Sequence, residues 1–377
     1  YDSKLNMKVT IFIGTMIHGG AHRVACIQAN ELAKAGYEVT LALVVGSHTY
    51  PYHISEDVKV VELLPKEDLE FSNLKSKLRR KIISIPAMVK YLNINKPDIV
   101  LSHIQSTNRE SIISCKISSV PIIVFEHTSH LLPKGKLGTI AYFDRRYLYR
   151  FADKVALLTS FDKEKFYDLY NINSVVIPNP CSFEPSNGFN QSGREKVIIT
   201  VGDLNRIEIK GWDTLLSIFA KISKDYPEWK LQFAGTGDKG KSKLVQMAKD
   251  FGISDKVEFL GNIKQLNLIL QKKSIFILTS RNEGLPMALI EAMSQGNACI
   301  AFDCKTGPSD IIRNGIDGIL VEDQNIDEMC VELRKLLDNI GLRSQYSHEA
   351  VTNSLLFSKQ RIVNKWNALI QETISDR

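Results

Sequence analysis

The sequence lacks the features that would place it in a membrane or in a secretory pathway. No apolar run approaches the roughly 18 residues that a membrane-spanning helix needs. No charged and then apolar segment precedes a small-residue cleavage site, as it would in a secretory signal peptide. We therefore expect a cytoplasmic protein.

The sequence is also poor in metal-binding patterns. Its six cysteines form no C-x-x-C pair and have no histidine at the spacing of a zinc site. No Asp-x-Asp motif offers carboxylates to Mg²⁺. We expect reduced, mostly buried thiols, no metal site and no cofactor.

The length and the charge distribution are informative. A chain of 377 residues, 44% hydrophobic and 24% charged, is typical of a soluble globular protein with two domains. Up to Pro180 there are 23 Lys and Arg against 17 Asp and Glu, whereas the remainder has 25 of each. The whole excess of +6 therefore lies in the N-terminal half.

Much of that excess is clustered. Basic and apolar residues alternate at helical spacing around Lys75–Lys81, and Arg145–Arg150 adds three arginines among aromatic residues. Such a pattern fits an ordinary solvated helix face. It also fits a surface that rests on anionic lipid. Nucleic acid fits less well, because no known binding motif accompanies the charge.

The N-terminal half begins with the pattern of a doubly wound sheet. Residues 8–13 and 37–44 read as buried strands, and Gly19 and Gly20 open an amphipathic helix between them that Gly36 ends. This is a βαβ unit. The turn GTMIHGG lacks the Lys-Ser/Thr of a P-loop and the spacing of a dinucleotide fingerprint, so a plain helix start fits it equally well.

A histidine follows one of the later strands of this half. Residues 96–101 and 121–125 read as parallel strands, and Glu126 and His127 come directly after the second. Ligands bind at the carboxyl ends of such strands. A histidine there can equally be a hydrogen-bonded structural residue.

The second half restarts with a strand at 197–201 and a loop, GDLNRIEIKG, that contains Arg206 and Lys210. A basic residue in this loop can neutralise phosphates. The later GTGDKG, 235–240, is formally a G-x-G-x-x-G motif. The next strand, 257–261, ends in Gly rather than in the acid that a dinucleotide ribose needs, so we interpret Gly235 and Gly237 as turn residues.

The stretch SRNEGLPMALIE, from Ser280 to Glu291, carries the main functional signal. It follows an apolar strand at 274–278, and Pro286 suits the first position of a helix. A helix N-terminus attracts phosphate, and Glu283 and Glu291 can accept hydrogen bonds from sugar hydroxyls. This arrangement favours a nucleotide-sugar site. Taken alone, the two glutamates also fit a helix surface residue and a first-turn acid.

With its continuation to Asp323, this stretch closely resembles the signature of glycosyltransferase family 4 (group 1), the retaining enzymes of the GT-B fold. The resemblance covers essentially the whole chain. It implies an α/β fold with two Rossmann-like, doubly wound domains facing a central cleft. We expect an acceptor-binding domain at 1–186 and a nucleotide-sugar-binding domain at 187–357. The last helix, about 358–377, would pack back on the first domain.

The resemblance also assigns residues to the site. His127, Glu283 and Lys210 would be catalytic, with Glu283 and His127 on the donor sugar and Glu291 on the ribose. The other binding residues would be Gly19, Gly20, Arg206, Asn262, Ile263, Gly284, Leu285 and Met287. Asp203 stands where the family has an Arg that Arg206 would replace, and Pro286 replaces a common Gly.

The activity that the resemblance implies is a retaining, metal-independent hexosyl transfer. The donor would be a UDP-linked hexose or N-acetylhexosamine and the acceptor a lipid-linked glycan of a bacterial surface polysaccharide. Binding of the basic cluster to lipid would place the protein at the inner face of the cytoplasmic membrane. A GDP-sugar donor, a UDP-sugar 2-epimerase of the same fold and a catalytically idle nucleotide-binding protein remain alternatives.

Overall fold

The computed structural model describes residues 7–17, 19–47, 50–65, 74–131, 136–187 and 191–377, with side chains except at 74–82 and 136–137. The chain forms two compact units. The first consists of Tyr1–Asn179 and Lys359–Arg377, and the second of Pro180–Ser358.

The division between the units falls before Pro180, earlier than the expected boundary at 186/187. Backbone hydrogen bonds explain the difference. The N–H of Cys181 donates to the carbonyl of Phe357 at 2.7 Å, and the N–H of Ser186 donates to that of Ser294 at 2.8 Å. The segment after Asn179 is therefore held on the second unit.

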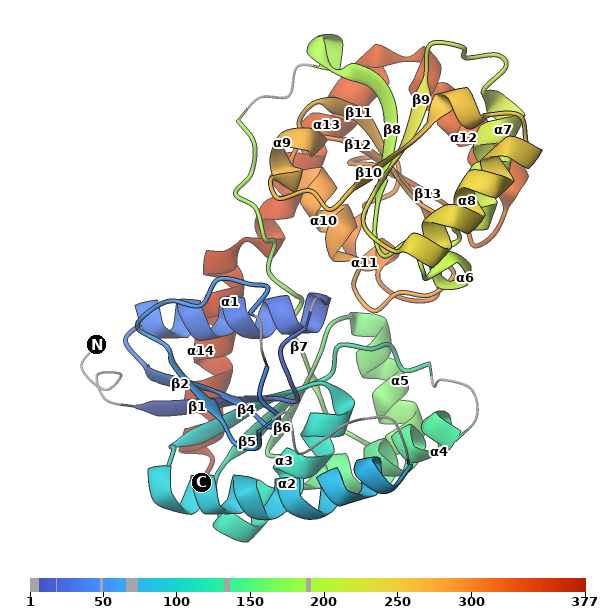
Figure 1. The fold of residues 1–377 in the computed structure, drawn as a ribbon. Coiled ribbons are helices and arrows are strands. Elements are labelled where there is room, and N and C mark those ends of the chain that lie inside the picture. The colour runs from blue at the N-terminus through green and yellow to red at the C-terminus, as the bar shows by residue number, and fades with distance from the viewer. Residues whose placement is uncertain (1–6, 18, 48–49, 66–73, 132–135, 188–190) are drawn as a thin grey trace. The chain divides into compact units, whose positions relative to one another are not determined.

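The first unit is built on a parallel sheet with the strand order β3-β2-β1-β4-β5-β6-β7, counted over the described residues (Figure 1). The strand order reverses between β1 and β4, and in open α/β sheets ligands bind at the carboxyl ends of the strands beside such a point. The strands are β1 (Lys8–Ile13), β2 (Glu38–Leu43), β3 (Lys59–Glu62), β4 (Ile99–His103), β5 (Ile122–Phe125), β6 (Lys154–Leu157) and β7 (Val175–Val176).

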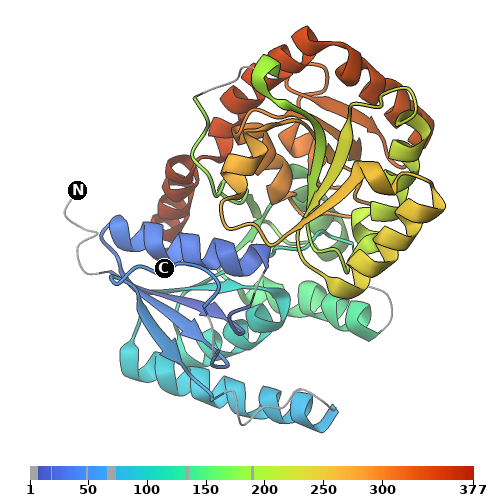
Figure 2. The same ribbon diagram turned by 45° about the horizontal axis from the view of Figure 1, so that its top comes forward.

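Helices cover both faces of this sheet, and α1 and α2 lie on opposite faces in both views (Figures 1 and 2). The last helix, α14, packs beside α1. Lys154 Nζ on β6 also pairs with Glu372 at 2.6 Å. The helical elements are α1 (Gly20–Lys34), α2 (Leu74–Asn95), α3 (Gln105–Ser118), α4 (Lys136–Phe143), the π-helical turn η2 (Asp144–Leu148), the 3₁₀ turn η3 (Tyr149–Phe151), α5 (Ser160–Tyr170) and α14 (Lys359–Ser375).

The second unit has a parallel sheet with the order β10-β9-β8-β11-β12-β13 among its described residues. Numbered along the chain, this is the Rossmann order 3-2-1-4-5-6, with its switch point between β8 and β11. The strands are β8 (Glu195–Val201), β9 (Lys230–Ala234), β10 (Val257–Gly261), β11 (Lys273–Leu278), β12 (Ala298–Asp303) and β13 (Ile319–Glu322). The expectation of two Rossmann-like, doubly wound domains is confirmed.

Two groups of helices flank this sheet: α7 contacts α8 and α12 in one, and α10 contacts α9 and α13 in the other (Figure 1). The buried side chains of Trp212 and Phe233 meet edge to face in the core beneath the first group. The helices are α6 (Ile207–Lys210), α7 (Trp212–Ile222), α8 (Asp238–Asp250), α9 (Leu266–Leu270), α10 (Met287–Ser294), α11 (Pro308–Ile311), α12 (Ile326–Asp338) and α13 (Ile340–Ser354), with 3₁₀ turns η4 (Gln191–Gly193), η5 (Ser254–Lys256) and η6 (Leu355–Phe357).

Candidate functional site

Lys210 and Glu283 meet at the switch point of the second unit. Lys210 ends α6, in the connection after β8, and Glu283 lies in the loop after β11. Lys210 Nζ donates to Glu283 Oε1 at 2.7 Å, and Ser280 Oγ donates to the same oxygen at 2.6 Å. The two side chains are only 15% and 11% exposed. The structure thus brings together two residues that the sequence placed 73 positions apart.

A glycine allows the two loops to approach this closely. Gly211 has a φ of +64°, and a Cβ there would lie 2.0 Å from the carbonyl oxygen of Thr279. Thr279 Oγ1 donates to the carbonyl of Gly211 at 3.0 Å, and the N–H of Arg281 donates to the carbonyl of Ile209 at 2.9 Å. Lys210 is therefore positioned by backbone contacts on both sides.

The helix after Glu283 begins one residue later than expected. Pro286 is the N-cap, with φ −71° and ψ 94°, and α10 starts at Met287. Gly284 lies in the turn before α10. Its carbonyl oxygen would lie 2.6 Å from a Cβ added to Gly307. Leu285 and Met287 have buried side chains, so a ligand would meet their backbone.

Glu291 lies inside α10 and is 2% exposed. This burial excludes the interpretation as a helix surface residue. The first-turn interpretation of Glu283 is excluded as well, because Glu283 precedes the helix and pairs with Lys210. Carboxylates are rarely buried without a polar partner, and Lys210 and Ser280 are the partners of Glu283.

The remaining residues predicted for the second unit lie at the same edge of the sheet. Asn262 and Ile263 follow β10, two strands from β8, and Asn262 is exposed. Arg206 is the exposed N-cap of α6, and its side chain pairs with no carboxylate in the described part of the chain. Asp203 is used locally, since its Oδ1 accepts the N–H of Asn205 at 2.9 Å.

The glycines of GTGDKG support the loop after β8. A Cβ on Gly235 would lie 1.8 Å from the carbonyl oxygen of Gly202, and one on Gly237 would lie 2.6 Å from the amide nitrogen of Asn205. Their lack of a side chain thus serves packing between loops, which supports the interpretation as turn glycines.

In the first unit, His127 follows β5 and is joined to a second histidine. His127 Nε2 lies 2.8 Å from His103 Nδ1, and His103 Nε2 lies 2.8 Å from Gln28 Oε1. Burial lowers the pKa of His127 to about 4, and the nearby His22 acts in the same direction. A neutral imidazole at the carboxyl edge of the sheet can exchange a hydrogen bond with a ligand hydroxyl.

The glycines at the start of α1 are placed differently from one another. The N–H of Gly19 donates to the hydroxyl of Tyr52 at 2.7 Å, so this amide is already engaged. Gly20 is the first residue of α1, and a Cβ there would meet no atom within 4 Å. The 15-residue helix gives this end the partial positive charge that suits an anion.

The expectation that Arg145 belongs to a lipid-binding surface is wrong. Its side chain is 1% exposed. It donates to Thr128 Oγ1 at 3.0 Å and to the carbonyl of His130 at 3.0 Å. Arg145 therefore holds the loop after β5, whereas Arg150 is exposed. The side chains of Lys75–Lys81 lie outside the described residues.

The described residues contain no candidate membrane span and no candidate metal site. None of their helices is both long and apolar enough to cross a membrane. In the same residues, no three His, Cys, Asp or Glu side chains are grouped as metal ligands would be.

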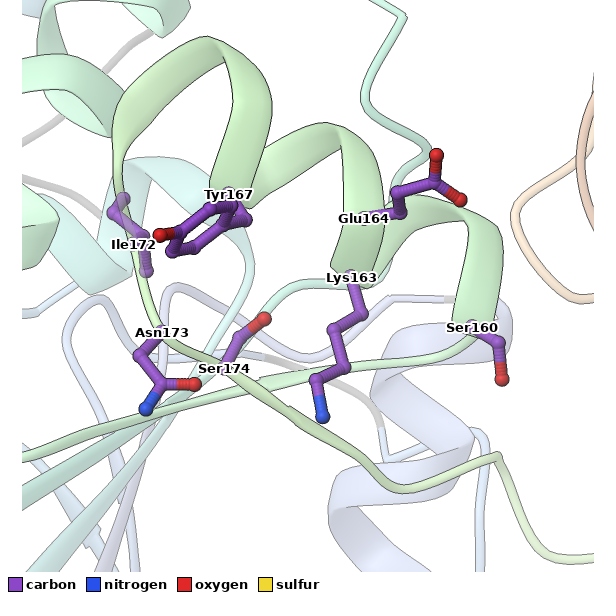
Figure 3. A pocket seen from close by; sticks show the side chains of 7 residues that line it. All are labelled: Ser160, Lys163, Glu164, Tyr167, Ile172, Asn173 and Ser174. Atoms are coloured by element: carbon purple, nitrogen blue, oxygen red, sulfur yellow. The ribbon is translucent and has the colours of Figure 1, made fainter.

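A shallow cavity of about 280 Å³ lies between α5 and the segment that follows it (Figure 3). Lys163 and Tyr167 line it from the helix and Asn173 and Ser174 from the opposite side. None of the residues predicted for the site lines this cavity.

The sequence interpretation missed His103, Gln28 and Ser280. His103 is the last residue of β4, and a polar residue at the end of an apolar strand beside the switch point could have identified it. Gln28 interrupts the apolar stripe of α1 between Val24 and Leu32, which was a second signal. For Ser280 the sequence offered only its nearness to Glu283.

Models of known protein families match residues in both units. Residues 18–184 match the family model Glycosyltransferase Family 4, and residues 184–352 match Glycosyl transferases group 1. The amylovoran biosynthesis glycosyltransferase AmsD of Erwinia amylovora is 27% identical over 374 residues, 96% of this chain and 99% of that protein.

Two further relatives span nearly the whole chain. The GalNAc-α-(1→4)-GalNAc-α-(1→3)-diNAcBac-PP-undecaprenol α-1,4-N-acetyl-D-galactosaminyltransferase of Campylobacter jejuni is 29% identical over 369 residues, 97% of this chain and 99% of that one. The crystal structure of Anabaena HepE in complex with UDP and glucose superposes with a TM-score of 0.76 at 16% identity, covering 98% of this chain and 100% of that chain. At this identity the last likeness concerns the fold.

Proposed function

Because the chain belongs to the family 4, group 1 glycosyltransferases, we propose that it transfers a hexose or N-acetylhexosamine from a UDP-sugar to a hydroxyl of a glycan acceptor, with retention of configuration. The observation that carries this proposal is the Lys210–Glu283 pair at the switch point, where Glu283 lies in the loop that leads into α10. It combines a cation, a carboxylate and a helix N-terminus.

Each of these groups has a role in the proposed reaction. Lys210 and the N-terminal amides of α10 stabilise the negative charge that grows on the diphosphate as the glycosidic bond breaks. Arg206, exposed at the start of α6, adds charge if the phosphates reach it. Protein groups supply this charge, so the proposed transfer needs neither a metal nor a cofactor.

The sugar and the nucleoside are held by hydrogen bonds. Glu291 accepts hydrogen bonds from the ribose hydroxyls, and Glu283 accepts one from the donor sugar. In the first unit, His127 is the residue proposed to bond to a sugar hydroxyl. The backbone beside Asn262 and Ile263 faces the base. None of these groups is proposed to act as a nucleophile. We therefore propose attack from the face that the phosphate leaves, with the phosphate accepting the acceptor's proton.

The relatives favour a UDP donor and a surface glycan. The Campylobacter relative is named for transfer to an undecaprenol-linked glycan, and HepE was crystallised with UDP and glucose. By analogy we propose a lipid-linked acceptor and a role in surface polysaccharide assembly, which would place the enzyme at the cytoplasmic face of the membrane. Lys75–Lys81 and Arg150 are the basic residues proposed to bind that surface.

A thermal-shift screen of UDP, GDP and ADP sugars, followed by product analysis, tests the proposal. A ligand at a hundred times its Kd stabilises the protein by about 2.7 kcal/mol, so the donor that binds best should raise Tm clearly. We expect UDP sugars to do so, and the best of them to yield a glycan product with an acceptor. Isomerisation of the UDP-sugar without an acceptor would indicate a 2-epimerase, and binding without turnover an idle binding protein. Stabilisation by GDP sugars alone would contradict the UDP assignment.

A further inference from the structure

Three side chains of the first unit form a row that the proposed reaction does not yet use in full. Gln28 lies on α1, His103 ends β4 and His127 follows β5. The two contacts between them both measure 2.8 Å. Gln28 and His103 are 0% exposed, and the His103 ring stacks on Phe125 with 4.9 Å between ring centres. Gln28 and His103 are therefore shielded from water.

The order of donors and acceptors in the row follows from its buried end. The Gln28 atom that faces His103 is the amide oxygen, which can only accept a hydrogen bond. His103 must then carry its proton on Nε2 and, being neutral, leave Nδ1 as an acceptor. His127 in turn donates from Nε2 to that nitrogen. The remaining nitrogen of His127, Nδ1, is left without a proton.

The free end of the row is an unsatisfied acceptor. His127 Nδ1 is buried and has no hydrogen-bond partner among the described residues. Burial has the largest effect on the pKa of the ring and keeps the imidazole neutral, although the Glu126 carboxylate and a loose hydrogen-bonding contact with the Asn179 side chain raise that pKa. A buried polar atom without a partner costs free energy, which a ligand that donates to it recovers.

We infer that Gln28, acting through His103, holds His127 in the tautomer protonated on Nε2, so that Nδ1 accepts a hydrogen bond from a sugar hydroxyl of a substrate. Gln28 and His103 are thus positioning residues, and His127 is the residue that touches substrate. The contact between His127 and substrate rests on the proposed function, whereas the tautomer of His127 does not.

Imidazole nitrogen NMR tests the tautomer directly. In protein labelled with ¹⁵N in the histidine rings, protonated and unprotonated nitrogens give distinct shifts, and a His127→Asn variant identifies the signals of that ring. At neutral pH we expect His127 to be protonated on Nε2. Protonation of wild-type His127 on Nδ1 would overturn the inference.

Two variants test the relay, by which we mean the hydrogen-bonded connection from Gln28 through His103 to His127. His103→Phe keeps a stacked ring and removes its nitrogens, and Gln28→Met keeps the length of the side chain and removes its amide. Both should leave His127 as a mixture of tautomers. Gln232→Met, a buried glutamine of the second unit, is the control and should leave it unchanged. A single, unaltered tautomer of His127 in both variants would refute the relay. Circular dichroism shows whether each variant is folded.

Kinetics separate the relay from the proposed function. With a UDP-sugar that is turned over, both relay variants should lower kcat by roughly 2- to 10-fold, the size of one hydrogen bond, while the Kd for UDP stays within about twofold. A relay seen by NMR without any sugar transfer would leave the tautomer established and refute the transferase proposal. Transfer at wild-type kcat in both variants would refute the positioning role.

Discussion

Lys210 Nζ lies 2.7 Å from Glu283 Oε1, and these two side chains neutralise each other at the carboxyl ends of β8 and β11. A diphosphate that binds Lys210 must compete with this carboxylate. Binding of the nucleotide diphosphate to Lys210 would release the Glu283 carboxylate from the ion pair. That carboxylate is then available for the hydrogen bond that we propose it accepts from the donor sugar. Neither residue can be altered without changing the other's surroundings.

Glu283→Gln should therefore separate binding from turnover. Removing the negative charge frees Lys210, so the affinity for UDP should stay the same or rise by about 0.5–1.5 kcal/mol, the size of one hydrogen bond. At the same time kcat should fall, because the sugar loses a charged acceptor. Calorimetry and steady-state kinetics measure the two effects. A loss of UDP affinity equal to the loss of kcat would contradict this division of roles.

Glu291→Gln should weaken UDP binding by about 1–3 kcal/mol, the range for a lost charged hydrogen bond. The substitution preserves volume at a position that is 2% exposed, so the helix should remain packed. Glu332→Gln on α12 is the control. The Glu332 side chain pairs with Lys335 at 2.6 Å and is not among the residues predicted for the site. Titration calorimetry decides the matter: an unchanged Kd for UDP would remove Glu291 from the ribose site.

Transfer should survive treatment with EDTA. The positive charge at the phosphates is proposed to come from Lys210 and the start of α10, so chelation removes nothing that the reaction uses. The assay compares initial rates with and without EDTA, and then after addition of Mn²⁺ or Mg²⁺. Loss of activity that either ion restores would show that a metal holds the diphosphate.

Gly211→Ala should destabilise the second unit by about 3 kcal/mol or more, because the new Cβ collides with backbone. Gly252→Ala is the matched control: its φ of +68° is close to the +64° of Gly211, but no atom lies within 4 Å of the new Cβ. It should cost about 1–2 kcal/mol, the penalty of the left-handed conformation alone. Equal losses in chemical denaturation would show that the approach to Thr279 is not tight.

The protein should sediment with anionic vesicles at low salt and dissociate at high salt. Each Lys or Arg near an anionic surface contributes about 1 kcal/mol, and the Debye length shrinks to roughly 3 Å at 1 M salt. Replacing Lys77, Arg79, Arg80 and Lys81 together by Gln should abolish sedimentation and leave UDP binding intact. Arg145 is left in place because it is buried. If the variant sediments as well as the wild type, the cluster is an ordinary solvated face.

The fold was predictable because its signals are local. Apolar runs, the glycine that ends α1 and the turn before α10 each lie within a few residues, and their order along the chain defines a doubly wound sheet. The pairing of Lys210 with Glu283 was only partly predictable. Both were expected at one edge of the sheet, but their direct contact depends on the backbone approach at Gly211.

Other features could not be read from the sequence. Arg145 and Arg146 are adjacent and chemically identical, yet Arg145 is buried against the 128–130 loop and Arg146 is only half-buried. The difference arises in the π-helical turn η2, which no local sequence pattern predicts. The hydrogen bonds from His127 through His103 to Gln28 likewise join residues of three different elements. Such contacts cannot be predicted from the local pattern of a single sequence.

Helix α14 completes the first unit with the last segment of the chain, after the entire second unit has been made. Its buried side chains include Ile362, Trp366 and Ile370, which belong to the first unit. During translation the first Rossmann sheet therefore leaves the ribosome with part of its apolar surface uncovered, and stays so until residues 359–375 follow. Closing that surface requires contacts of very long sequence separation, because the whole second unit lies between α14 and the rest of the first unit along the chain.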